Sequence, residues 1–373
     1  MNTKMRNVCF LLGLIFSLWG CKQGQDLKLG AAQTIRIDMN SSDLQKDAYA
    51  FHNFDYLQLE LTDESALRSI DKVLPYKDKL YILSAQDPKV FIFSSTGKYL
   101  SSINRGQGPG EIMFANDIDV YKDTLYVFDL YRTIKKYTLD GEYVGVRQKF
   151  ERPFFSMKCM GQGFLLFDPN IDRKSDYNLH YISGDTIKNY LKKKDFLKEA
   201  NFLYRDFYRK GYVSWPLCDT IYAIKENEPY AGYIVEFNGN SFYNQNLDKL
   251  VTSAEFCKMN QDKTLMRWIK DVMPYDKGLF FAFNHDCTYF VRYNQGQTRI
   301  FPNFIDGLPE VKQAAVGYSD NKLIYVFNAE DILQFRIDNP KVESNDRVSS
   351  LYKGVKNEED NPVLVYVNVC DSE

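Results

Sequence analysis

A strand-like phrase rich in aliphatic and aromatic residues recurs along this chain at a nearly constant interval. Leu80 and Leu125 hold the same place in two such phrases and are 45 residues apart. The glycines of the two turns that follow, Gly97 and Gly141, are 44 residues apart. Two different landmarks therefore give almost the same period. An interval of about 40 to 45 residues is typical of one four-stranded propeller blade.

The same unit can be followed through most of the chain. One such unit is too small to bury its faces alone, so the repeats must stack around a ring. The sequence therefore predicts an all-β fold, a six-bladed β-propeller of four-stranded antiparallel blades over residues 34–373. We expect the strands at Tyr56–Leu61 and Val363–Val369 to complete the last blade together. The six copies are expected at residues 69–103, 117–148, around 164–185, 211–237, 268–304 and from 314 onward.

Two segments depart from the spacing of strands. Between Leu247 and Met273, apolar residues follow helical spacing among charged residues. This pattern predicts a short helical insertion between the fourth and fifth blades. Asn328, followed by the acids Glu330 and Asp331, is typical of the start of a helix.

The N-terminus has the pattern of a secretory signal. Two basic residues precede an apolar run of twelve, Val8–Trp19, which is too short to span a bilayer comfortably. The run ends in Leu-Trp-Gly-Cys, which resembles the lipobox of bacterial lipoproteins, with Cys21 as the thiol that takes the lipid. We therefore expect a signal peptide at residues 1–20, and a lipidated Cys and flexible tether at 21–33. The expected location is the outer membrane, on its periplasmic or cell-surface side.

Composition excludes one class of partner. The chain has 45% hydrophobic and 26% charged residues and a net charge of −2, so it lacks the basic stripe that nucleic acid requires. Tyr and Phe number 27 each against 3 Trp, which favours β-structure. We expect a monomer that binds no nucleic acid and is attached to the membrane through its lipid anchor alone.

Candidate nucleophiles and metal ligands are sparse. Five cysteines follow Cys21 without a C-x-x-C pair, so neither a zinc site nor a disulfide framework is indicated. A single disulfide between two of them is the alternative in an oxidising compartment. The chain has three histidines, His52, His180 and His285. The His285-Asp286-Cys287 sequence is better explained as a turn than as a catalytic cluster, because adjacent strand residues point to opposite faces. We find no catalytic residue and no metal site.

A glycine-rich loop, Arg105-Gly-Gln-Gly-Pro-Gly-Glu111, joins the first two blades. It lacks the Gly-Lys-Ser/Thr ending of a phosphate-binding loop. Glycines allow positive φ and close backbone approach, so the loop suits a tight crossing between blades. Such a crossing would lie by the mouth of the central channel. The ligand-binding candidates are therefore Arg105, Gln107, Glu111 and Asp117.

Four segments together resemble a known family: Tyr56–Thr62, Arg105–Glu111, Cys218–Tyr222 and Asn361–Leu364. They are similar to the six-bladed β-propeller lipoproteins of Bacteroides and its relatives, a branch of the NHL-type propellers. The resemblance spans nearly the whole mature chain. The resemblance implies a six-bladed β-propeller fold and a location in the cell envelope. It implies no particular substrate or reaction.

Related six-bladed propellers include calcium-dependent hydrolases and lyases with metal ligands lining the channel. Asp117, Asp119, Asp129 and Asp168 are expected near strand ends where such ligands could lie. Calcium needs six to eight oxygen ligands, and spacing alone does not identify such a set. We expect no cofactor, with calcium as the alternative.

The leading hypothesis from the sequence is a non-catalytic, lipid-anchored propeller that binds a peptide, glycan or envelope protein. A metal-dependent hydrolase or lyase with its site in the central channel is the first alternative. A structural scaffold within an envelope complex is the second.

Overall fold

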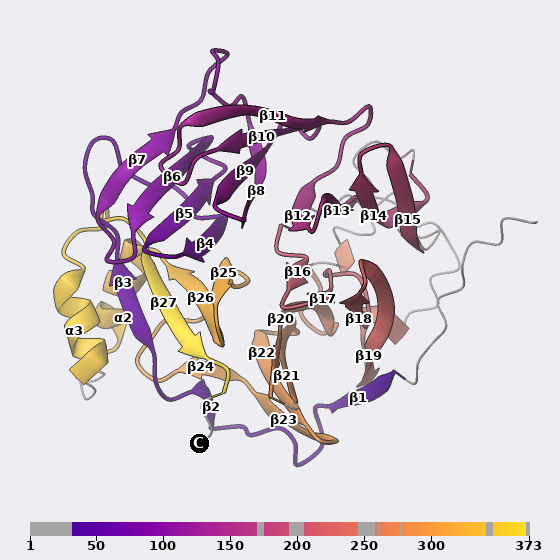
Figure 1. The fold of residues 1–373 in the computed structure, drawn as a ribbon. Helices are drawn as coiled ribbons and strands as arrows, with labels where there is room; N and C mark the ends of the chain where they lie inside the picture. The colour runs from indigo at the N-terminus through magenta and orange to yellow at the C-terminus, as the bar shows by residue number, and fades with distance from the viewer. Residues whose placement is uncertain are drawn as a thin grey trace, which may run out of the picture.

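The fold was analysed in a computed structural model, which describes residues 32–169, 175–193, 205–244, 258–259, 261–276, 278–340 and 346–370. Antiparallel sheets follow one another around a common axis in a propeller-like ring (Figure 1). Most strands of a sheet are joined by short turns, so sequence neighbours are also spatial neighbours. The fold is all-β apart from a few short helices.

Three of the sheets within the described residues have four strands each. The first contains β8 (Ala115–Tyr121), β9 (Thr124–Asp129), β10 (Thr133–Tyr137) and β11 (Tyr143–Lys149). The second contains β12 (Ser156–Met160), β13 (Gly163–Phe167), β14 (Tyr177–Ser183) and β15 (Thr186–Lys192). The third contains β20 (Arg267–Tyr275), β21 (Gly278–Asn284), β22 (Thr288–Asn294) and β23 (Gln297–Phe301).

The remaining sheets of the described residues have five, eight and two strands. The five-stranded sheet runs in the order β1 (Gln33–Asp38), β19 (Glu228–Asn238), β18 (Thr220–Lys225), β17 (Tyr212–Val213), β16 (Tyr208–Arg209). The eight-stranded sheet runs β3 (Asp55–Gln58), β27 (Val363–Asn368), β26 (Lys322–Phe327), β25 (Gly317–Ser319), β4 (Lys72–Tyr76), β5 (Lys79–Ser84), β6 (Lys89–Ser94), β7 (Tyr99–Ile103). The short sheet pairs β2 (Tyr49–Phe51) with β24 (Asn303–Ile305).

The prediction of six separate four-stranded blades is wrong. The first and last repeats share one eight-stranded sheet, because β25 pairs in parallel with β4 through Gly317 and Val73. A Cβ at Gly317 would lie 2.1 Å from the Val73 carbonyl oxygen, so only glycine allows this approach. A second departure is β1, which adds to the outer edge of β19 in parallel as a fifth strand.

The predicted helical insertion is also not supported. Part of that segment lies outside the described residues, and its end belongs to strand β20 (Arg267–Tyr275). Two register shifts interrupt this strand, and Trp268 and Asp271 have positive φ values of 60° and 58°. Such bulges break the two-residue alternation of a strand, so buried residues three apart imitate helical spacing.

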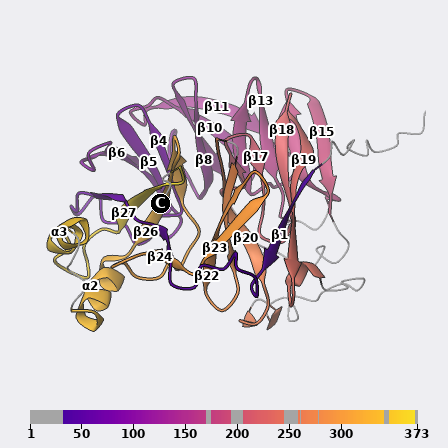
Figure 2. The same cartoon turned by 90° about the horizontal axis from the view of Figure 1, so that it is seen from below.

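Other expectations are confirmed. Strand β27 pairs with β3 from Val363↔Gln58 to Tyr366↔Asp55, so the C-terminal strand and the early strand do complete one sheet. Helix α2 (Ala329–Asp338) begins after Asn328 with two acids in its first turn. It lies with α3 (Asp346–Gly354) at one side of the ring, beside β3 and β27 (Figures 1 and 2).

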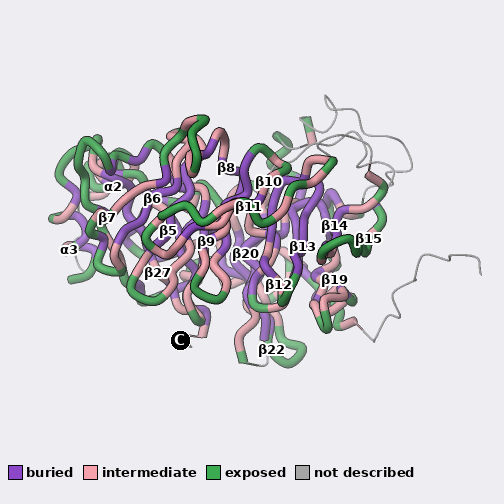
Figure 3. The backbone as a smooth tube through the Cα atoms, turned by 45° about the horizontal axis from the view of Figure 1, so that its top comes forward, coloured by how far each residue is buried: buried purple, intermediate pink, exposed green. Residues whose placement is uncertain are grey.

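The core lies between neighbouring sheets. The second strands, such as β5, β13 and β21, are buried along almost their whole length, whereas the outer strands β11 and β15 are mostly exposed (Figure 3). One cluster joins β5 and β6 to β8 and β9, and another joins β4–β6 to β26 and β27. Burial between adjacent sheets is what holds the ring together, as each sheet covers a face of the next.

Candidate functional site

The glycine-rich loop is held together by its own backbone and by Glu111. The Glu111 carboxylate accepts a hydrogen bond of 2.7 Å from the Gly108 amide. A Cβ at Gly106 would lie 1.9 Å from the same carboxylate oxygen. Gly110 has φ +86°, which favours glycine. Glu111 therefore braces the loop, and the glycines make room for it.

This loop packs on outer strands of the following sheet. Lys135 of β10 donates a hydrogen bond of 2.6 Å to the Glu111 carbonyl oxygen, and the Tyr137 hydroxyl donates one of 3.1 Å to that of Gly110. Arg105 and Gln107 are exposed. A ligand role for Arg105, Gln107 and Glu111 stays a prediction that the structure does not test.

Asp117 does not join the loop residues. It lies on β8 and is fully buried, and its carboxylate pairs with the Lys72 ammonium of β4 at 2.7 Å. It also accepts hydrogen bonds of 2.8 Å from the amides of Met157, on β12, and Ile118. Burial raises the pKa of Asp117, and the Lys72 ammonium opposes this shift. Asp117 therefore links three successive innermost strands.

Similar pairs continue around the ring. They join Asp119 to Lys158 at 2.7 Å, Asp71 to Arg205 at 3.0 Å and Asp271 to Arg209 at 3.7 Å. The strands that carry most of these residues, β4, β8, β12, β16 and β20, surround the centre of the ring (Figure 1). Asp119, Asp271 and Arg209 are each at most 3% exposed, so these members of the pairs are shielded from solvent.

The four acids considered as calcium ligands are each paired with a cation. Besides the pairs of Asp117 and Asp119, Asp129 lies 2.8 Å from Lys135 and Asp168 lies 3.3 Å from Lys193. Among the described residues, no group of three or more His, Cys, Asp or Glu side chains is arranged to hold a metal ion. These acids have the surroundings of structural ion pairs.

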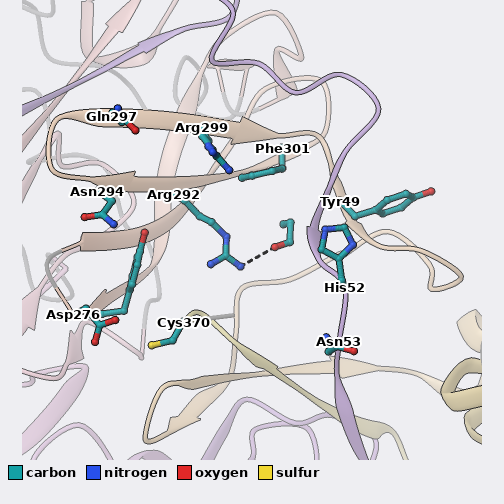
Figure 4. A pocket seen from close by; sticks show the side chains of 12 residues that line it. Tyr49, His52, Asn53, Asp276, Arg292, Asn294, Gln297, Arg299, Phe301 and Cys370 are labelled. Carbon is teal, nitrogen blue, oxygen red and sulfur yellow. Dashed lines mark hydrogen bonds between the residues drawn. The ribbon is translucent and has the colours of Figure 1, made fainter. Parts of the chain in front are cut away.

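A pocket of about 520 Å³ opens at the edge of the ring (Figure 4). Four segments that are distant in sequence form it: the β2 segment, the end of β20 with Asp276, the β22–β23 hairpin and Cys370, just after β27. Its volume lies within the range of small-molecule sites. It is lined by Tyr49, Ala50, His52, Asn53, Tyr275, Asp276, Arg292, Asn294, Gln297, Arg299, Phe301 and Cys370.

The β22–β23 hairpin supplies one wall with an ordered set of side chains. Arg292 lies directly opposite Arg299, and the next same-face pair is Asn294 opposite Gln297. On the other side of the arginines, Phe290 lies opposite Phe301. One face of the hairpin therefore changes from aromatic to cationic to amide toward its tip.

Arg292 is held in a defined position. Its guanidinium donates hydrogen bonds of 2.5 Å to the Val369 carbonyl oxygen and 2.9 Å to that of Ala50, the latter shown in Figure 4. It also lies over the rings of Phe51 and Phe280, at 5.2 and 5.9 Å from their centroids. Stacking and carbonyl contacts of this kind orient a guanidinium plane before any ligand arrives.

Sequence reasoning missed this pocket, although part of its signal was readable. Alternate residues of the hairpin, Phe290-x-Arg292 and Arg299-x-Phe301, place two arginines on the same face of two consecutive strands. No comparable signal marks Tyr49–Asn53. Those residues reach the pocket because β2 pairs in parallel with β24, some 250 residues later.

The histidine cluster at residues 285–287 is a turn between β21 and β22, as predicted. The ring nitrogens of His285 lie 3.0 Å from Asp286 and 3.2 Å from the Thr264 carbonyl oxygen. Burial raises the pKa of the Cys287 thiol, with Asp286 adding to the effect. A thiol that stays protonated is a poor nucleophile, so the cluster lacks the character of a catalytic dyad.

His180 is buried among polar partners. Burial and the neighbouring Arg152 lower its pKa to about 4. Asn189 Oδ1 lies 2.7 Å from Nδ1, and Arg152 Nη2 lies 2.9 Å from Nε2. The Tyr177 carbonyl oxygen also lies 3.1 Å from Nε2, so both ring nitrogens have polar partners within hydrogen-bond distance.

This histidine should make the protein sensitive to mild acid. In the unfolded chain this histidine becomes protonated as the pH falls below about 6.5, whereas in the folded protein it becomes protonated only near pH 4. The free energy of unfolding therefore decreases as the pH falls through this window. The loss should reach about 2 kcal/mol at pH 5. Urea unfolding at pH 7 and pH 5 measures it, and His180→Gln should flatten the difference. The exposed His52→Gln serves as the control; equal pH dependence in both variants would contradict the assignment.

The architecture and the pocket define a class: an all-β, propeller-like protein with a polar pocket at the edge of its ring. The chain belongs to the family described as "Domain of unknown function (DUF4934)", whose model matches residues 32–368. No curated protein matches the sequence. None of the helices among the described residues is long and apolar enough to cross a bilayer.

Two solved structures of Bacteroides proteins align with this chain. A Bacteroides fragilis protein described as a "Putative exported protein" aligns with a TM-score of 0.72 at 18% identity, over 91% of this chain and 99% of its own. A member of the DUF4221 family from Bacteroides vulgatus aligns with a TM-score of 0.48 at 13% identity, over 86% and 98% of the two chains. The first of these supports the fold.

Proposed function

We propose that this protein is an exported, lipid-anchored binding protein of the cell envelope, and that the pocket beside the β22–β23 hairpin holds its ligand. One observation carries the ligand site. Polar and charged side chains from four distant segments converge on one concave space of about 520 Å³. A pocket with a few convergent polar groups is the usual form of a small-molecule or peptide site.

The envelope address rests on the N-terminus and on a relative. Residues 1–31 lie outside the described part of the chain, so the signal peptide, Cys21 and most of the tether remain a proposal from sequence. The described chain begins with β1 on the outer edge of the five-stranded sheet, just after the expected tether. The similar Bacteroides fragilis protein is itself described as a "Putative exported protein".

The lipid anchor makes a direct prediction. Cys21→Ser removes the thiol that would receive the lipid, so incorporation of labelled palmitate in the native host should be abolished. The protein should also move from the membrane fraction to the soluble fraction. Cys9→Ser, within the same apolar run, is the matched control and should leave labelling intact. Labelling of the Cys21→Ser protein at the wild-type level would refute the anchor.

We propose that ligand binding requires no metal ion or cofactor. The acids that would serve a channel enzyme are engaged with lysine or arginine, as described above, which favours binding over metal chemistry. Candidate ligands are peptides, glycans and other envelope proteins.

Filling the pocket should abolish binding without unfolding the ring. Asn294→Trp with Gln297→Trp adds bulk from two exposed positions at the hairpin tip. Arrays of envelope glycans and peptides should show ligands that bind the wild type and are lost from this variant. Thr186→Trp, on the exposed tip of another hairpin, should bind as the wild type does. Binding unaffected by the double change would place the ligand site elsewhere, on a scaffold surface or on the glycine-rich loop.

A further inference from the structure

A second pocket, of about 620 Å³, opens between the β8–β11 sheet and the β12–β15 sheet, which are neighbours in the ring (Figure 1). Residues of three turns, β8–β9, β12–β13 and β14–β15, and of strands β9, β11, β12 and β13 form this inter-sheet pocket. It shares no lining residue with the pocket beside the β22–β23 hairpin. It is lined by Tyr121, Lys122, Thr124, Tyr126, Arg147, Cys159, Gly161, Gln162, Gly163, Phe164, Ser183 and Gly184.

The lining of the inter-sheet pocket contains two cations and no acid. Lys122, in the β8–β9 turn, and Arg147, on β11, are both exposed, and neither forms an ion pair with another described residue. Asp123, the residue after Lys122, is engaged elsewhere, because its carboxylate lies 2.6 Å from Lys77 Nζ in the β4–β5 turn. In a chain of net charge −2, this pocket is a local concentration of positive charge.

Arg147 is held in place at the wall of this pocket. Its guanidinium lies 5.8 Å from the centroid of the Phe164 ring, and Nη2 donates a hydrogen bond of 3.1 Å to the Gln162 carbonyl oxygen. Burial raises the pKa of Tyr126, and the Arg147 guanidinium opposes this shift, so the cation also lies near that hydroxyl. A guanidinium has five N–H donors, and the Gln162 contact engages one of them. Arg147 is therefore oriented and still able to donate to a ligand.

The rest of the lining is uncharged and rich in hydroxyl groups. Burial and the neighbouring Asp119 raise the pKa of the Cys159 thiol well above its usual range, so the thiol adds no negative charge. The turns are bare at Gly161 and Gly184, where an added Cβ would meet no atom within 4 Å. Groups that both donate and accept hydrogen bonds are the hydroxyls of Tyr121, Thr124, Tyr126 and Ser183 and the amide of Gln162.

We propose that the inter-sheet pocket is a second ligand site, which binds a saccharide through an acidic group on the sugar. Arg147 and Lys122 hold the carboxylate or sulfate, because hydrogen bonds between a cation and an anion are the strong ones. The hydroxyls and the Gln162 amide pair with sugar hydroxyls, which also donate and accept. No aliphatic side chain lines the pocket, and Phe164 is only 4% exposed, so an apolar peptide side chain or a lipid tail has no recess there.

Titration calorimetry on the full mature chain tests this proposal by comparing each acidic sugar with its neutral counterpart. The pairs are digalacturonic acid with galactobiose, and 6′-sulfolactose with lactose, and inorganic sulfate is the simple anion. At least one acidic sugar should bind about tenfold or more tightly than its counterpart. The pair that shows this difference identifies the carboxylate or the sulfate as the recognised group.

Two results of this comparison would overturn the proposal. The acidic group has no role if both acidic sugars bind no better than their neutral counterparts, or show no binding at millimolar concentration. The sugar has no role if inorganic sulfate binds as tightly as the preferred acidic sugar.

Arg147→Gln should weaken binding of the preferred acidic sugar about tenfold and leave its neutral counterpart unaffected, and Lys122→Gln should act in the same direction. Arg132→Gln is the matched control, because Arg132 is also exposed and also donates to a carbonyl oxygen, that of Glu151, at 2.8 Å. This control should bind as the wild type does. Arg147→Gln with wild-type affinity would remove the arginine from the site.

A filled pocket separates this site from the one proposed above. Ser183→Trp adds bulk to the inter-sheet pocket and should abolish binding of the acidic sugar, whereas Asn294→Trp with Gln297→Trp should leave it intact. Wild-type affinity in Ser183→Trp would overturn the second site and leave the pocket beside the β22–β23 hairpin untouched. Loss of binding only in the double variant would also overturn it, because the acidic sugar would then bind beside that hairpin.

Discussion

Replacing Asp117 with alanine should lower the free energy of unfolding by about 3–5 kcal/mol, the usual loss when one partner of a buried ion pair is removed. Lys72, a residue that is 7% exposed, would keep its ammonium without the carboxylate that it pairs with. The amides of Met157 and Ile118 would lose their acceptor as well. Urea unfolding of the purified domain measures the change.

Two further variants separate charge from packing. In Lys72→Met with Asp117→Leu, both charges are gone, so part of the lost stability should return relative to Asp117→Leu alone. Glu236→Ala breaks an exposed pair with Arg36 and should change stability by less than about 1 kcal/mol. If Asp117→Ala cost no more than Glu236→Ala, the axial pairs would not hold the ring as argued.

A methyl group at Gly317 should destabilise the protein by about 2–3 kcal/mol or more. The added carbon would lie 2.1 Å from the Val73 carbonyl oxygen, and the obstacle is backbone, which cannot rotate away. Gly317→Ala therefore forces β25 from β4 and opens the eight-stranded sheet. The Val73 amide, which donates to the Val316 carbonyl at 2.8 Å, should lose protection from hydrogen exchange.

Gly232→Ala is the matched control for this prediction. Its φ is also ordinary for an L-residue, and the nearest atom to an added Cβ lies 3.3 Å away, so a small adjustment accommodates the methyl group. Gly317→Ala with wild-type stability and wild-type exchange at Val73 would show that the two repeats do not depend on this contact.

Strand positions were predictable because the second strand of each repeat has a strong local signature. Leu80, Leu125, Leu279 and Leu323 fall in β5, β9, β21 and β26, which are buried on both faces and so read as apolar runs. The signature failed at β20, where bulges changed the spacing of buried residues.

The candidate site was less predictable, for a different reason. Asp117 was expected at a channel mouth, because its place at the start of a strand was readable and its burial was not. Lys72, 45 residues earlier, decides that environment. The pocket depends on still longer connections, such as that of Arg292 with Ala50, 242 residues apart.

The sequence by itself determined the period, the strands and the turns of this protein, since these follow from alternation, glycine and apolar runs within a few residues. The tertiary structure alone decided how the strands are shared among sheets, which acids meet cations, and where a pocket opens. Gly317 against Val73, and β1 against β19, are contacts between distant parts of the chain. Local pattern does not encode them, because their free energy arises only when the ring closes and brings those backbones together.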